Sequence, residues 1–187
     1  MKGLLLSGIP ELIFITFAFM LGHGDKYVSV LMAALIHELG HICMAAILGV
    51  KMKFLKTGIV GISLKYHFTY TSPLKEAAVC LAGPLMGVVV FFLGFKNGAV
   101  SYFTAASLGL TVFNLLPISF LDGGCALSAV LSIFLSPDTV WKVCRVLSVI
   151  FTIILWCAAV MLMLHSNGDI SAMTVSIYLL YRLFSEC

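Results

Sequence analysis

The chain is a succession of long apolar runs separated by short polar turns. Five runs are long enough to cross a bilayer as an α-helix, which takes about 20 residues. They cover residues 3–22, 27–50, 73–94, 99–121 and 140–164. A sixth run, 170–181, is short, and an interfacial helix would show the same pattern. The pattern therefore predicts an all-α polytopic membrane protein with about six transmembrane helices.

Residues 51–71 differ from these runs in their pattern. Apolar Ile62, Leu64 and Tyr66 alternate with polar residues, and four lysines and two glycines lie in the same stretch. A period of two is typical of β-strands. We therefore expect a short β-hairpin associated with the membrane surface; an irregular basic loop is the alternative.

The third and fourth apolar runs contain residues that disturb a helix. In the third, Pro84 should break or bend the helix, and the pair Gly83 and Gly87 has the spacing that lets a neighbouring helix approach closely. The fourth run ends in a segment from Asn114 to Gly124 that contains Asn, Pro, Asp and two Gly. Breaks of this kind inside a membrane are tolerated where the backbone is buried in protein or lines a wet cavity. The fourth helix is therefore predicted to be broken, with helix resuming at 125–135.

Composition agrees with a membrane protein. The chain is 61% hydrophobic and 10% charged, and its mean hydropathy is +1.13. A soluble domain cannot bury that much apolar side chain. One membrane domain accounts for the whole length, 1–187. No basic cluster is interleaved with aromatic residues, so nucleic acid is not expected as a partner.

The basic residues predict an orientation. With six crossings, nine lysines and arginines fall on the side of the N-terminus and two on the other. The nine are Lys2, Lys51, Lys53, Lys56, Lys65, Lys75, Lys142, Arg145 and Arg182, and the two are Lys26 and Lys96. Basic residues accumulate in cytoplasmic loops. The predicted location is therefore the cell membrane, multi-pass, with both termini in the cytoplasm.

The candidate chemistry lies in the second run, which contains His37-Glu38-Leu39-Gly40-His41. On a helix His37 and His41 lie on one face, one turn apart, and can hold a Zn²⁺ beside Glu38, the candidate general base. The alternative is a structural pair of packed histidines that hydrogen-bond to the backbone or to Glu38 and hold no metal. That alternative buries three polar groups in lipid without gain.

A catalytic zinc usually has three protein ligands and one open position. Asp122 is the remaining ionisable residue in a helix break at membrane depth, so it is the predicted third ligand of one zinc per chain. Glu38 would accept a proton from water and pass it to the leaving amine. Asn114 could donate a hydrogen bond to the substrate or to the oxyanion.

The two motifs together resemble the site-2 protease family of intramembrane zinc metalloproteases. The pentad precedes Asn114-x-x-Pro117-x-x-x-x-Asp122-Gly123, and Ala82-Gly83-Pro84 resembles a Gly-Pro feature of the family's third helix. The resemblance implies zinc binding by His37, His41 and Asp122. It also implies catalysis by Glu38 and a substrate contact by Asn114.

The resemblance is nearest to the bacterial subgroup that includes the sporulation sigma-factor-processing protease. Many family members have Asn where this chain has Gly87, which leaves any role of that Asn unfilled. No PDZ insertion and no nucleotide-binding CBS domain are expected.

The predicted function is hydrolysis of a peptide bond in a membrane-anchored or membrane-associated regulatory protein, near the cytosolic leaflet. A catalytically silent membrane scaffold or receptor that retains the zinc site is the alternative. A di-iron lipid enzyme would need more histidines than the five present, and a transporter would need polar residues along a continuous path.

Overall fold

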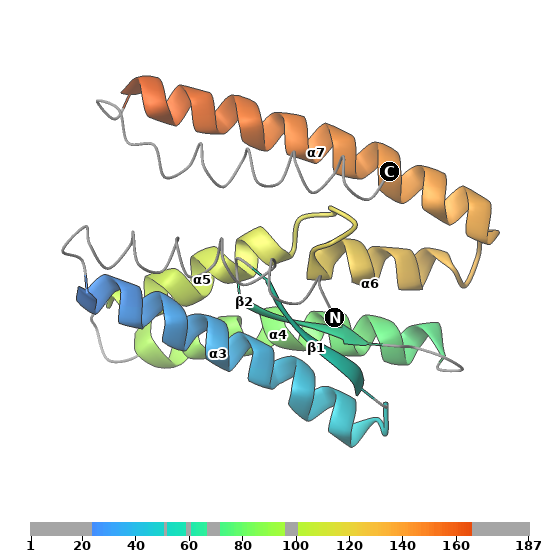
Figure 1. Cartoon of the computed structure of the whole chain (residues 1–187), viewed down its shortest axis with the longest axis horizontal. Helices are drawn as coiled ribbons and strands as arrows, with labels where there is room; N and C mark the ends of the chain where they lie inside the picture. The colour runs from blue at the N-terminus through green and yellow to red at the C-terminus, as the bar shows by residue number, and fades with distance from the viewer. Residues whose placement is uncertain (1–23, 51, 59–60, 67–71, 96–100, 166–187) are drawn as a thin grey trace, which may run out of the picture. The chain divides into compact units, whose positions relative to one another are not determined.

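The computed structural model describes residues 24–50, 52–58, 61–66, 72–95 and 101–165, which form two compact units (Figure 1). The first unit ends at Leu115 and the second begins at Leu116. Helices α3, α4 and α5 and strands β1 and β2 belong to the first unit, and helices α6 and α7 belong to the second. The single domain expected over residues 1–187 stays a prediction.

Helix α3, Gly24–Ile47, has one buried face and one exposed apolar face. Ala33, His37, His41 and Ala45 are buried, and they recur every four residues, so they lie along one side of the helix. The helix ends in a turn at Gly49, whose φ of 66° suits glycine. Val50 N–H donates to the Ala45 carbonyl at 2.8 Å across this turn.

Helix α4, Pro73–Phe95, is continuous through Pro84. The sequence predicts a break or a bend at this proline, and the break is wrong. A proline removes one backbone hydrogen bond, and α4 packs against both α3 and α5, which supports the helix across the gap (Figure 1). Helix α4 approaches α5 closely at Gly87, because a Cβ there would lie 3.0 Å from the Ser107 carbonyl oxygen and nearer still to Thr111 Oγ1.

Helix α5, Tyr102–Asn114, is capped by Ser101, whose hydroxyl accepts a hydrogen bond from Thr104 N–H at 3.3 Å. The helix has 13 residues, fewer than a crossing needs. The fourth apolar run, expected as a span over 99–121, is therefore interrupted well before its end. Helix stops at Asn114, where the sequence predicts the break, and resumes at Asp122 rather than at residue 125.

Strands β1, Met52–Gly58, and β2, Gly61–Tyr66, pair antiparallel in a two-stranded sheet. Leu55 pairs with Leu64 and Gly58 with Gly61, and the register is irregular between Met52 and Phe54. The strands lie in the region where the alternating pattern predicts them, and β2 packs against α3 (Figure 1). Their association with a membrane surface stays a prediction.

The second unit consists of α6, Asp122–Leu131, and α7, Pro137–His165, with α7 running back along α6 (Figure 1). Ser148 of α7 fixes the segment before α6. Its hydroxyl accepts Ser119 N–H at 2.8 Å, lies 2.7 Å from Ser119 Oγ, and donates to the Cys144 carbonyl at 2.7 Å. Ile118 is fully buried, and a Cβ on Gly124 would collide with the backbone of Ile118 and Ser119.

Three helices in the described part of the chain are long and apolar enough to cross a membrane. They are α3 over Val28–Ile47, α4 over Pro73–Phe95 and α7 over Pro137–Met161. The first and sixth predicted crossings, 3–22 and 170–181, lie outside the described residues. The total of six crossings therefore stays a prediction.

We predict that Gly87→Ala destabilises the first unit by about 1–3 kcal/mol, because the added methyl overpacks the contact between α4 and α5. Thermal unfolding of the detergent-purified protein measures this. Thr111→Ala in the same background should recover part of the loss, and Gly109→Ala, which meets no atom within 4 Å, should be nearly neutral. Equal effects of Gly87→Ala and Gly109→Ala would contradict the close contact.

We also predict that Ser148→Ala lowers the free energy of unfolding by about 1–2 kcal/mol, because it removes the partner of Ser119 N–H and hydroxyl. Ser128→Ala is the matched control, since that hydroxyl bonds the Cys125 carbonyl of its own helix. The control should change stability by less than about 0.5 kcal/mol. Denaturant or thermal unfolding of both variants measures the two stability losses. Equal losses would count against the role of Ser148.

Candidate metal centre

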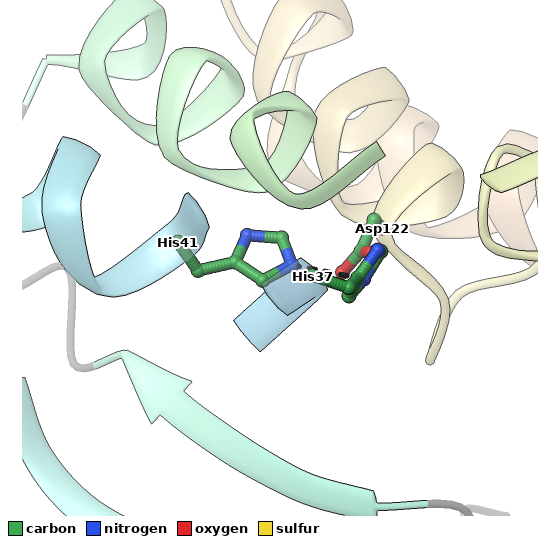
Figure 2. Close-up of side chains that lie close together, drawn as sticks. All are labelled: His37, His41 and Asp122. Atoms are coloured by element: carbon green, nitrogen blue, oxygen red, sulfur yellow. Dashed lines mark hydrogen bonds between the residues drawn. The ribbon is translucent and has the colours of Figure 1, made fainter. Parts of the chain in front are cut away.

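The two histidines of the pentad meet inside the first unit (Figure 2). His37 and His41 lie one turn apart on α3 and are only 4% and 3% exposed. Their Nε2 atoms are 3.2 Å apart, and the rings meet edge to face with centroids separated by 4.9 Å. The helical spacing thus places two imidazole nitrogens at one buried point, as the sequence predicts.

A backbone carbonyl of α4 sets the tautomer of His41. Nδ1 of His41 lies 2.7 Å from the Val79 carbonyl oxygen. A carbonyl can only accept, so Nδ1 carries a hydrogen, and in the neutral ring Nε2 then keeps its lone pair. A metal-binding histidine usually donates its other ring N–H in this way, which orients the ring. Nε2 of His41 is therefore ready to bind a cation.

The spacing of the two nitrogens fits zinc. Zn–N bonds are about 2.0–2.1 Å long, and tetrahedral angles then place two nitrogen ligands about 3.3–3.4 Å apart. The observed 3.2 Å between the Nε2 atoms is close to that value. Both side chains also belong to a residue type that zinc prefers. The pair therefore fits a zinc ion with little rearrangement.

Close contact between α3 and α4 allows the bond from His41 to Val79. Gly40 faces α4 at the point of contact, and a Cβ there would lie 2.7 Å from the Ala82 carbonyl oxygen and 2.6 Å from Met86 Cγ. Backbone cannot move away from such a clash as a side chain can. A glycine in the pentad is thus required by the approach of the two helices.

Glu38 and Asn114 both belong to the first unit. Glu38 follows His37 on α3 and is partly buried. Asn114 is the last residue of α5, which packs against α3. Its Nδ2 donates one hydrogen to the Leu110 carbonyl at 3.0 Å, and the amide has a second N–H to offer.

Asp122 belongs to the second unit and is the first residue of α6. Its carboxylate is partly buried, and a negative charge is favoured at a helix N-terminus. Leu121, the N-cap residue, provides no capping side chain.

Sequence reasoning missed three features around these residues. The Val79 carbonyl is a backbone group, so no residue type indicates it. Ser148 lies 29 residues from its partner Ser119 in an apolar helix, where it resembles any small residue. Gly83 was interpreted as a glycine for close helix packing, although it lies beside the two histidines. The Gly-Pro pair was the sequence feature that singled out this part of the helix.

The chain was compared with known proteins. No family model matches it. Stage IV sporulation protein FB of Bacillus subtilis (strain 168) is 30% identical over 174 residues, which cover 88% of this chain and 59% of that protein. This chain therefore spans about three fifths of the length of that relative.

A solved structure, a site-2 protease from Methanocaldococcus jannaschii, has a similar fold with a TM-score of 0.68. The two chains are 21% identical, and the match covers 95% of this chain and 88% of the other. The sporulation relative agrees with the subgroup to which the motifs point, and the solved structure agrees with the predicted fold. The resemblance of this chain to the site-2 protease family is thereby confirmed.

Proposed function

We propose that this chain is an intramembrane zinc metalloprotease of the site-2 protease type. The observation that carries the proposal is the pair of buried Nε2 atoms 3.2 Å apart on an apolar helix, with the His41 ring oriented by Val79. Burying two imidazoles costs free energy unless they are bonded. A metal ion shared by the two Nε2 atoms is a partner that suits this geometry.

The proposed ligands are His37, His41 and Asp122, with one zinc per chain. Two imidazoles and a carboxylate form a donor set that could hold a metal ion. Three protein ligands leave one coordination position for water, as in catalytic rather than structural zinc sites. In this proposal the second unit contributes the carboxylate through the first turn of α6.

The proposed mechanism assigns separate roles to the remaining polar residues. Zinc, when bound, lowers the pKa of a coordinated water and polarises a carbonyl group. Glu38 accepts a proton from the attacking water and then delivers it to the nitrogen of the leaving amine. Asn114 donates its second amide N–H to the substrate or to the developing oxyanion.

The proposed substrate is a membrane-anchored or membrane-associated regulatory protein, cut near the cytosolic leaflet. Three helices long and apolar enough to cross a membrane support a site in the bilayer. The excess of basic residues on one side supports cytoplasmic termini in a multi-pass topology of the cell membrane. The likeness to a sporulation protein supports a regulatory substrate.

We predict that Glu38→Gln slows cleavage by at least about 100-fold, because the amide cannot accept the proton. Zinc content and fold should stay unchanged, since Glu38 is not a proposed ligand. Candidate membrane-bound transcription regulators are co-expressed with wild type or variant, and cleavage is followed by immunoblot. Zinc is measured by mass spectrometry of the purified proteins.

Cleavage by Glu38→Gln at the wild-type rate would remove Glu38 as the base. Zinc-loaded wild type that cleaves none of the candidates, like the variant, would favour the silent scaffold or receptor. Purified wild type without zinc would contradict the metal centre itself.

We further predict that Asp122→Asn weakens zinc binding by more than about 100-fold. Loss of a residue that only orients a metal ligand typically costs about 10–100-fold in affinity. A neutral amide oxygen is a poorer zinc ligand than a carboxylate. Competition with a chelator of known affinity measures the change. Wild-type affinity in this variant would mean that the third ligand is another residue.

A further inference from the structure

Helix α4 passes the two histidines at Gly83, a buried residue. A Cβ built on Gly83 would lie 2.8 Å from His37 Nε2, 2.7 Å from His41 Cε1 and nearer still to His41 Nε2. Real Cβ atoms essentially never come so close to other atoms. The missing side chain therefore faces the two nitrogens that would bind the metal.

We propose that Gly83 is a positioning residue of the metal centre, required so that both imidazoles can direct Nε2 at one ion. This inference rests on the proposed function. An alanine methyl at position 83 would occupy the space beside both Nε2 atoms, where Zn–N bonds of about 2.0–2.1 Å would place the ion. A methyl group and a metal ion cannot both occupy this space unless the imidazole rings turn away.

The His41 ring is not free to turn. His41 is held by the 2.7 Å bond from its Nδ1 to the Val79 carbonyl, and Val79 lies one turn before Gly83 on α4. Both histidines are buried. One turn of α4 therefore orients an imidazole with its backbone, and the next turn leaves the imidazoles space by lacking a side chain.

Gly83 and Gly87 differ in what they face, although they form one Gly-x-x-x-Gly pattern. The missing Cβ of Gly87 points at Thr111 and Ser107 of α5. That of Gly83 points only at His37 and His41 among its three nearest contacts. Gly87 thus serves helix packing, and Gly83 serves the histidine pair. The pattern alone does not distinguish the two.

The test is zinc binding by Gly83→Ala in the full chain, purified in detergent and reloaded with zinc alone. Zinc content should fall at least tenfold from that of wild type. Cobalt(II) loading provides a second readout, because the visible bands of a tetrahedral site should be lost. Zinc should raise the melting temperature of wild type and leave that of Gly83→Ala unchanged. Gly109→Ala, in open space on α5, is the matched control and should behave as wild type.

Normal zinc content or cobalt bands in Gly83→Ala would overturn the inference and leave the proposed function standing. Wild type that binds no zinc would instead contradict the proposed function. If Gly83→Ala folds poorly, the same change is made in a His37→Ala/His41→Ala background. There the methyl has no imidazole to meet, so the melting temperature should stay that of the double variant. A loss of stability in that background would overturn the inference, because Gly83 would then serve general packing.

Discussion

The structure depends on keeping two imidazoles satisfied inside an apolar set of helices. A buried polar group without a partner costs on the order of 1–3 kcal/mol, and His37 and His41 are both almost fully buried. The bond from His41 to the Val79 carbonyl satisfies one ring nitrogen and leaves the other nitrogen turned toward His37. Because this bond joins α3 to α4, it also fixes how closely the two helices approach.

Small residues make that approach possible at separate positions. Gly40 removes a clash with the backbone of α4, and Gly87 removes one with α5. Without a hydrophobic driving force in lipid, helices associate mainly through close packing and hydrogen bonds. The same contacts that hold α3, α4 and α5 together therefore determine the geometry of the histidines. Stability and site geometry are not independent in this unit.

Much of this organisation could be predicted from the sequence, because the length of an apolar run and the residues that end a helix are local signals. The predicted runs at 27–50, 73–94 and 140–164 correspond to α3, α4 and α7, and the expected break begins at Asn114 as observed. The restart of helix at Asp122 rather than at residue 125 was not predicted, because Gly123 and Gly124 are poor helix formers. Continuity at Pro84 depends on neighbouring helices, which composition does not indicate.

The meeting of the two histidines was predicted from the sequence, and the groups that surround them were not. His37 and His41 are brought together because four residues make about one helical turn. The Val79 carbonyl and the space at Gly83 arise from helix contact across about forty residues of sequence, so local patterns cannot indicate them.

The position at which α3 ends affects how water can reach the two histidines. The glycine turn at Gly49 stops the helix at Ile47, six residues beyond His41, which is about 9 Å of rise. The proposed hydrolysis would consume one water molecule in every turnover, and bulk water does not dissolve in hydrocarbon. The proposed metal centre, so near a helix end, would be hydrated over a short path, so the depth of the histidines along α3 also limits how far water would travel.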